Sequence, residues 1–546
     1  MSQIENDLKL EIIKSVKKSF DLDIEMNDVI IELPKDVSHG DYASNIAMQL
    51  ARTLKRKPKE IAESICSNLN LDIISSYEIA GPGFINIFLK NEYLAEVINL
   101  VLDQDEKYGH NNTGNGLKIN IEYVSANPTG DLHPGHARGA ALGDSVSRLL
   151  KMSGYDVTRE YYVNDAGNQI NNMALSLRAR YFQEFNYDVE VPEDGYHGSD
   201  LIDIAKDLVS KVNDKYINYD EEEALIEFKK FGLEAELNKI KADLKAFNCE
   251  FDVFFSEQYI RDNKFVEKAL NQLKDRGYTY EKDNALWLKT TSFNDDKDRV
   301  IVKSDGSYTY LTPDIAYHLN KLDRGYDKLV DVLGADHHSY VVRLKAAIQA
   351  LGYEQDKLEV DIVQMARMIK DGEEFKLSKR SGKAVALIDL LDEVGSDALR
   401  YFFISRAADT QMDFDLDMAI KRSNENPVYY AQYAHARMCS ILNSAKDIDI
   451  SRKFNLISNE KELTLIKHIN EFPKVVADAA YTRMPHKLCN YISKLAQYFH
   501  SFYGECKVLD YDNIPLSTQR LALVKASKIT LKNALNSIGV SAPESM

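Results

Sequence analysis

One stretch in the first third of the chain runs in the order strand, polar turn, helix, strand. The segments Ile119–Val124 and Val157–Val163, rich in β-branched and aromatic residues, predict two strands. A helix is expected between them, from about Gly135 to Met152. This order is the repeating unit of a doubly wound parallel α/β sheet. The α/β pattern returns at three later segments, Val300–Val302, Leu329–Leu333 and Val360–Met365.

The chain has 546 residues, and a single core stops growing at roughly 250–300 residues, so several domains are expected. Residues 1–110 predict a small α/β domain. Its expected elements are helices at Ile4–Phe20 and Asp41–Leu54 and strands at Val29–Leu33 and Phe84–Phe88. Residues 111–425 hold the doubly wound domain, with a linker at its start and a helical insertion at about 168–275. In residues 426–546 apolar positions recur every three to four residues, which predicts a helical bundle.

The formal net charge of -17 argues against a general nucleic-acid coat protein and against DNA as a partner. A specific nucleic-acid partner remains possible through a local basic face. The five cysteines form no CxxC pair, which is typical of a reducing cytoplasm and disfavours a disulfide framework or a structural zinc. No stretch approaches the roughly 20 apolar residues of a membrane span. A soluble cytoplasmic protein is expected.

The first chemical motif is SANPTGDLHPGH at 125–136, between the first strand and the helix. His133 and His136 stand three apart at a helix start, where backbone N–H groups and the helix dipole favour phosphate. Gly135 would allow a flat ring such as adenine to approach the backbone. A turn with two incidental histidines is the alternative, while a zinc site lacks an evident third ligand.

The second motif follows the strand near Met365 and is a polar loop rich in lysine and arginine, at 368–383. Ammonium groups on such a loop can neutralise the charge that develops on a departing pyrophosphate. The alternative is a solvated charged loop.

HPGH at 133–136 and KLSKR at 376–380 resemble the HIGH and KMSKS signatures of class I aminoacyl-tRNA synthetases, with departures at Pro134, Leu377 and Arg380. The complete phrase SANPTGDLHPGH is similar to that of arginyl-tRNA synthetases. Further stretches resemble the same family: residues 33–51, 305–327, 334–343 and 426–437. The chain's end is also similar, although Ser545 stands where arginine is usual.

This resemblance implies a Rossmann catalytic core, an N-terminal domain that contacts the tRNA body and a helical anticodon-binding domain. The implied enzyme is an arginine–tRNA ligase, which makes arginyl-adenylate from L-arginine and ATP with Mg²⁺. It then charges the tRNA for arginine and releases AMP and pyrophosphate. Activation that requires bound tRNA is implied too, as is a monomer. No protein-bound structural metal is expected, although His337–His338 leaves a metal site as an alternative.

The resemblance also implies residue roles. His133 and His136 would contact the ATP phosphates, with Gly135 and Gly334 beside the nucleotide. Lys376 and Lys379 would stabilise pyrophosphate, and Ser378 would shape their loop. The arginine site would include Ser125, Asn127 and His136, and its guanidinium contacts would come from Tyr310, Asp314 and Asp336. Core packing of Tyr310 and helix capping by Asp314 are the alternatives for those two residues.

Two surfaces are candidates for tRNA. The basic run Lys55, Arg56 and Lys57 would contact phosphates, with a solvated helix end as the alternative. Tyr429 and Tyr433, one helical turn apart, would stack on bases, with burial in the bundle as the alternative.

Three other functions compete with this one. A small nucleotidyltransferase shares an HxGH turn but would have no large helical domain at its end. A class I synthetase for another amino acid, such as cysteine or glutamate, is the second alternative, and the cysteine enzyme would need zinc cysteines that the sequence does not provide. A catalytically inactive tRNA-binding paralogue would have no need of both histidines and both lysines. Because a guanidinium site rejects other amino acids strongly, we expect no editing domain in the insertion.

Overall fold

The computed structural model describes residues 3–34, 39–70, 72–375 and 385–546. A five-stranded sheet, parallel throughout, lies at its centre in the order β12-β11-β5-β6-β7. Its strands are β5 (Lys118–Glu122), β6 (Asp156–Val163), β7 (Val253–Ser256), β11 (Lys328–Gly334) and β12 (Leu358–Val363). This confirms the predicted doubly wound fold. The strand order reverses between β5 and β11, and open α/β sheets bind ligands at such a point.

Helix α5 (Pro134–Met152) crosses from β5 to β6 and is almost wholly buried along its length. It contacts the sheet, helix α14 (Ser396–Ile404) and helix α17 (Glu460–Thr482). The helix whose start carries the two motif histidines is therefore embedded in several parts of the molecule.

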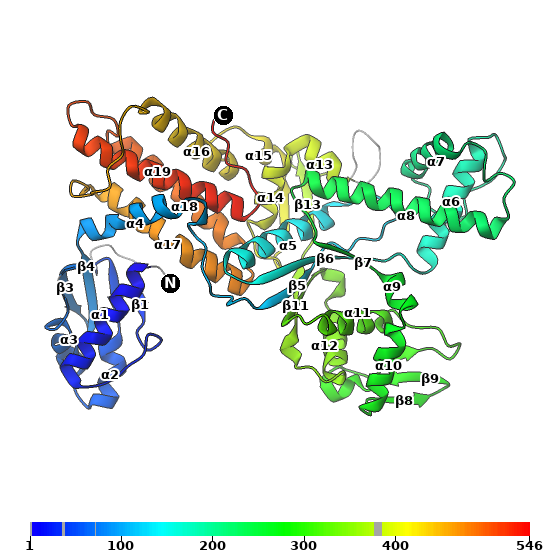
Figure 1. Ribbon diagram of the computed structural model, residues 1–546, viewed down its shortest axis with the longest axis horizontal. Coiled ribbons are helices and arrows are strands. Elements are labelled where there is room, and N and C mark those ends of the chain that lie inside the picture. The colour runs from blue at the N-terminus through cyan, green and yellow to red at the C-terminus, as the bar shows by residue number, and fades with distance from the viewer. Residues whose placement is uncertain (1–2, 35–38, 71, 376–384) are drawn as a thin grey trace.

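The N-terminal domain is a four-stranded antiparallel sheet, β1-β2-β4-β3, covered by helices (Figure 1). Its elements are α1 (Gln3–Phe20), β1 (Ile31–Glu32), β2 (Tyr42–Ser44), α2 (Ile46–Leu54), α3 (Pro58–Cys66), β3 (Ile74–Ala80) and β4 (Phe84–Leu89). The predicted helix at Asp41–Leu54 is wrong over its first residues. Tyr42–Ser44 pairs with β4, because Tyr42 and Ser44 bury their side chains on one face while Asp41 accepts a 2.6 Å hydrogen bond from the Leu89 N–H.

Helix α4 (Asn91–Gln104) leaves this domain and packs against the helices at the end of the chain. Those helices are α16 (Pro427–Ser444), α17, α18 (His486–Glu505) and α19 (Ile514–Ser537), and they confirm the predicted bundle (Figure 1). Within the described parts of the chain, no helix is both long enough and apolar enough to cross a bilayer.

The segment at 168–275 is mostly helical and contains one strand. Helices α6 (Asn168–Gln183), α7 (Ser199–Val212) and α8 (Glu221–Ala246) share an apolar core of their own. The following β7 joins the central sheet beside β6, so this part of the segment belongs to the α/β core. Lys239 of α8 forms a 2.5 Å ion pair with Asp131, which ties the long helix to the turn before His133.

A second lobe follows, shown in green at the lower right of Figure 1. Its elements are α9 (Glu257–Asp262), α10 (Phe265–Asp275), β8 (Thr279–Lys282), β9 (Ala285–Leu288), β10 (Arg299–Val302), α11 (Leu311–Asp323) and α12 (Tyr340–Ala350). The strand predicted at Val300–Val302 exists, but it does not extend the parallel sheet. It pairs antiparallel with β9, which in turn pairs with β8, so the three strands form a local antiparallel meander.

A small sheet, β14-β13-β15, connects the core to the bundle. Its strands are β13 (Ala366–Lys370), β14 (Glu373–Glu374) and β15 (Met412–Asp415), with helices α13 (Leu387–Val394), α14 and α15 (Leu416–Ile420) beside it.

Arg400 of α14 is a fully buried junction between distant segments. Its guanidinium donates to Asp144 of α5 (2.5 Å), to the carbonyls of Phe247 and Asn248 after α8 (both 3.1 Å), and to the carbonyl of Ile538 after α19 (3.1 Å). Asp144 is also fully buried and accepts a second bond from Arg148 at 2.6 Å. One arginine thus joins the central helix, the end of the insertion and the end of the bundle.

Candidate active site

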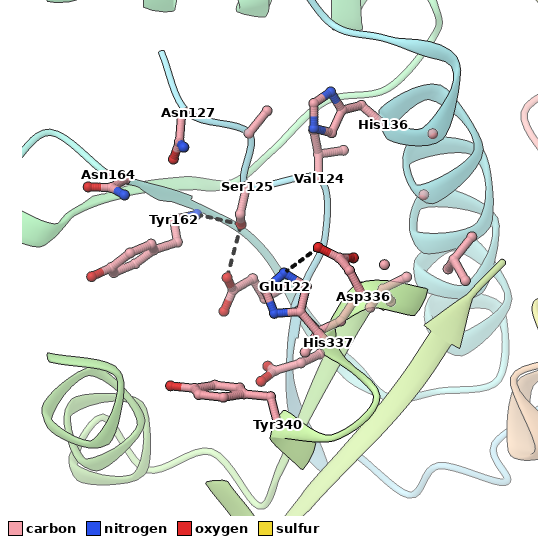
Figure 2. A pocket seen from close by; sticks show the side chains of 18 of the residues that line it. Glu122, Val124, Ser125, Asn127, His136, Tyr162, Asn164, Asp336, His337 and Tyr340 are labelled. Atoms are coloured by element: carbon pink, nitrogen blue, oxygen red, sulfur yellow. Dashed lines mark hydrogen bonds and ion pairs between the residues drawn. The ribbon is translucent and has the colours of Figure 1, made fainter. Parts of the chain in front are cut away.

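A cavity of about 480 Å³ opens where the strand order of the central sheet reverses. Its walls come from the segment after β5, the start of α5, the ends of β6 and β11, and helices α11 and α12 (Figure 2). Expected site residues in its lining are Ser125, Asn127, His133, Gly135, His136, Asp314, Gly334 and Asp336. The structure therefore brings most of the expected site together from distant parts of the sequence.

The backbone directly after β5 is strained. Val124 and Ser125 have φ values of 68° and 40°, a region that β-branched residues in particular avoid. The Ser125 hydroxyl holds this turn by donating to Glu122 Oε1 (2.9 Å) and accepting from the Tyr162 N–H (3.0 Å), as Figure 2 shows. The turn exposes the following backbone and Asn127 to the cavity.

His133 caps the N-terminus of α5 with its ring. Its Nδ1 accepts from the Gly135 N–H (3.1 Å) and the His136 N–H (3.4 Å), while the His133 N–H donates to His136 Nδ1 (3.3 Å). The two rings stack at 3.6 Å between centroids. Because both Nδ1 atoms act as acceptors, each neutral ring carries its proton on Nε2.

Burial lowers the pKa of both histidines. For His136 it acts together with the neighbouring His133 and lowers the pKa to about 4. Two neutral rings at a helix N-terminus can donate Nε2–H bonds to an anion without titrating near neutral pH.

The structure gives a second reason, besides ligand access, why glycine stands at position 135. A Cβ atom there would lie 2.9 Å from the His133 ring, so the capping arrangement itself needs glycine.

The opposite wall of the cavity is acidic. The pKa of Asp314, on α11, is raised by burial to about 6, although a hydrogen bond from the Tyr340 hydroxyl and the nearby His318 oppose this shift. Glu122, at the end of β5, is also buried. Buried carboxylates beside a cavity favour a cationic ligand.

Behind this wall lies a layer of buried charges. Lys321 Nζ donates to Glu122 Oε2 (2.5 Å) and to Asp331 Oδ1 (3.1 Å). Arg324 binds Glu160 through two 2.7 Å bonds, and the Tyr317 hydroxyl donates to the same carboxylate at 2.7 Å. Opposite charges are thus matched where water has little access.

Some expected residues lie elsewhere. Tyr310 is 89% exposed and does not line the cavity, so the structure does not pair it with Asp314. The Asp336 side chain lines the cavity but is 81% exposed, and it pairs with His337 Nε2 at 3.4 Å. Lys376, Ser378 and Lys379 fall outside the described residues. In the described ranges, no group of three His, Cys, Asp or Glu side chains is arranged to hold a metal ion.

The expected tRNA-contacting residues lie on two surfaces. Lys55 ends α2 with a left-handed backbone, Arg56 lies over the Phe20 ring, and Lys57 is exposed at the start of α3. On α16, the half-buried rings of Tyr429 and Tyr433 stack at 6.1 Å with an interplanar angle of 9°.

Sequence reasoning missed Glu122, Tyr162, Asn164 and Tyr340, all of which line the cavity (Figure 2). Only Glu122 had a local signal, because a glutamate at the end of a strand in a doubly wound sheet, which is covered on both faces, requires an explanation.

Comparison with known proteins gives consistent matches along the chain. Family models match for the arginyl tRNA synthetase N terminal domain at residues 6–89, the catalytic domain of tRNA synthetases class I (R) at 97–438 and the DALR anticodon binding domain at 431–546.

Curated relatives match over the full chain. The arginine–tRNA ligase 1 of Halalkalibacterium halodurans is 53% identical and covers all of both chains. The arginine–tRNA ligase of Bacillus subtilis is also 53% identical, over 100% of this chain and 99% of its own. Among solved structures, the arginyl-tRNA synthetase of Thermus thermophilus covers both chains fully with a TM-score of 0.76 at 22% identity, a likeness of fold.

Proposed function

Because this chain belongs to the arginyl-tRNA synthetase family of class I aminoacyl-tRNA synthetases, it is an arginine–tRNA ligase, and we propose that the cavity beside β5 and α5 is its active site. The arginine carboxylate attacks the α-phosphorus of ATP, and pyrophosphate leaves. A ribose hydroxyl at the 3′ end of the tRNA then attacks the carbonyl of the mixed anhydride, and AMP leaves. Such chemistry depends mainly on positioning and charge stabilisation.

One observation carries the site assignment: the cavity has two ends of opposite preference. The helix N-terminus with its neutral histidine pair is suited to phosphates, and the wall of Asp314 and Glu122 is suited to a guanidinium. The phosphates of ATP match the first end and the guanidinium of arginine matches the second. The arginine carboxylate and the α-phosphate of ATP would then meet between the two ends.

Specific contacts follow from this placement. His133, Gly135, His136 and Gly334 face the nucleotide, and Ser125 and Asn127 lie near the amino and carboxylate groups of arginine. Asp314 binds the guanidinium, with Glu122 behind it. For Tyr310, and for pyrophosphate stabilisation by Lys376, Ser378 and Lys379, the support is the sequence motif alone. For Asp336 the support is the motif together with its place in the cavity lining.

The remaining parts serve the tRNA. The N-terminal domain, with Lys55, Arg56 and Lys57, contacts the tRNA body, and the bundle with Tyr429 and Tyr433 reads the anticodon. Activation of arginine waits for bound tRNA. Mg²⁺ enters with ATP, because this ion is commonly held by substrate phosphates and water. The protein acts as a cytoplasmic monomer.

Arginine-dependent exchange of pyrophosphate into ATP, with and without the tRNA for arginine, tests this function. Exchange only with tRNA supports both the site and its dependence on tRNA. Exchange without tRNA removes that dependence. No exchange with arginine, together with no charging of the tRNA, would overturn the proposal.

A further inference from the structure

His318, on α11 one turn after Asp314, is buried with hydrogen-bond acceptors on both sides of its ring. Its Nδ1 lies 2.8 Å from the Asp314 carbonyl oxygen, and its Nε2 lies 2.7 Å from Asp331 Oδ2. A neutral imidazole has one N–H, so one nitrogen would turn its lone pair toward an acceptor. Only the imidazolium can donate to both acceptors at once, so this geometry favours the charged form of His318.

The surroundings of His318 have the charges that this requires. The groups around it are Asp331 on β11, Lys321 and Asp314 on α11, Glu122 on β5 and Glu160 on β6. Burial alone would lower the pKa of His318, but the ion pair with Asp331 outweighs it and raises the pKa. Asp331 therefore shares its two oxygens between two cations, His318 and Lys321.

When the buried cations and carboxylates of this layer are paired, one carboxylate remains without a cation. The cations His318, Lys321 and Arg324 match the carboxylates of Asp331, Glu122 and Glu160. Asp314 is extra. It faces the Tyr340 hydroxyl, with the acids Glu122 and Glu257 nearby, and no lysine or arginine among the described residues forms an ion pair with it. With His318 charged, the layer lacks one positive charge, at the cavity wall.

We propose that His318 is a positioning residue for the arginine site: a permanent buried imidazolium that ties the Asp314 backbone to β11 and presents the Asp314 side chain to the substrate as a carboxylate. The guanidinium then supplies the missing charge. This rests on the proposed function, since it assumes that Asp314 binds arginine. Neutral His318 would leave a deficit of two positive charges and would favour protonation of Asp314.

The kinetic test compares His318→Gln with the wild type between pH 5.5 and 8.5. Glutamine is neutral and cannot donate to both acceptors in the same geometry. His468→Gln is the matched control, because His468 is also buried and its Nε2 faces a carbonyl, that of Tyr491 at 3.0 Å, within the bundle. The KM values for arginine and ATP are measured separately, at saturating tRNA.

We expect His318→Gln to raise the arginine KM at least tenfold at pH 7.5 and to leave the ATP KM within twofold. The pH below which arginine binding weakens should also move upward by at least half a unit. A merely structural role would not shift this midpoint. An arginine KM within twofold of the wild type and an unchanged midpoint would overturn the proposal.

A second measurement does not depend on the His318→Gln variant. In wild-type protein with ¹⁵N-labelled histidine, both ring nitrogens of His318 should carry protons throughout pH 6–8, and His468→Gln should leave these signals in place. A single protonated nitrogen would refute the imidazolium even if His318→Gln does not fold. Failure of the wild type to activate arginine would count against the proposed function, while the NMR result would still decide the charge of His318.

Discussion

Asp314 is the residue on which the cavity's preference for a cation depends most. It is a buried carboxylate for which burial raises the pKa, and its hydrogen-bond donor is the neutral Tyr340 hydroxyl. A ligand that supplies charge and two parallel N–H donors gains most at such a group.

Replacing Asp314 with Asn should therefore weaken arginine binding selectively. Loss of a hydrogen bond to a charged group costs roughly 1.5–3 kcal/mol, so the arginine KM should rise about 10- to 150-fold with little change in the ATP KM. Asp336→Asn is the matched control, because the Asp336 side chain is largely exposed. If both substitutions raise the arginine KM equally, Asp314 does not contribute more to arginine binding than Asp336.

His136 makes stability depend on pH. Its folded-state pKa is lowered to about 4 from an ordinary 6.5, so the unfolded chain binds a proton that the folded chain does not. The free energy of unfolding should fall as pH drops from about 6.5 toward 4 and should be insensitive to this group above 6.5. His136→Gln should reduce the difference in melting temperature between pH 5 and pH 7.5; an unchanged difference would exclude His136 as a source.

At the scale of residues, the sequence predicted those features that depend only on neighbouring positions in the chain. The histidine pair and the turn before it lie within one short motif, and their place at a helix start could be read directly. Glu122 could not be assigned, because its partner Lys321 lies 199 residues away and only the folded sheet brings them together. Tyr310 fits its motif, yet the structure turns it to solvent.

Among the elements, helix α8 is unusual because it contains a buried glutamate. Glu236 is fully buried, and neither of its carboxyl oxygens has a hydrogen-bond donor within the described parts of the chain. Burial raises its pKa to about 7, with Asp200 adding to the effect. Lys239, one turn along, is already paired with Asp131.

Glu236→Gln should therefore stabilise the protein at alkaline pH. A carboxyl with a raised folded-state pKa gives its full stability below the unfolded pKa, near 4.5, and loses it as pH rises through about 7. The cost is on the order of 3 kcal/mol at pH 8. The variant should melt above the wild type at pH 8, with the gap closing at pH 5. A gap that is the same at both pH values would refute the titration of Glu236.

Elements that the sequence did not resolve are those whose identity depends on a distant partner. Tyr42–Ser44 fits a helical pattern until β4 is present to pair with it. β7 is four residues long, and its place in the central sheet depends on β6. β10 was recognised as a strand, but local periodicity does not show which sheet a strand joins.

For the molecule as a whole, the junction of Arg400 and Asp144 is the decisive contact. Removing one partner of a fully buried ion pair leaves an uncompensated charge and costs roughly 3–5 kcal/mol. Asp144→Asn should accordingly lower the apparent melting temperature by several degrees and increase proteolysis around α5 and α14.

The control is Arg367→Met, which breaks the exposed pair with Asp413 and should cost less than about 1 kcal/mol. If both variants melt alike, the buried junction does not hold the domains together.

The contacts of Arg400 can be completed only late in the synthesis of the chain. The carbonyl of Ile538 that it binds also accepts a bond from Ser145 on α5, across 393 residues. A ribosome that adds about 5–20 residues per second needs roughly 20–80 s to make that stretch. During this interval Ser145, in the middle of α5, cannot form its hydrogen bond to the Ile538 carbonyl. A nascent chain that stalls during this interval leaves uncovered the face of α5 that α17 and α19 contact in the complete protein, and chaperones and proteases can bind there.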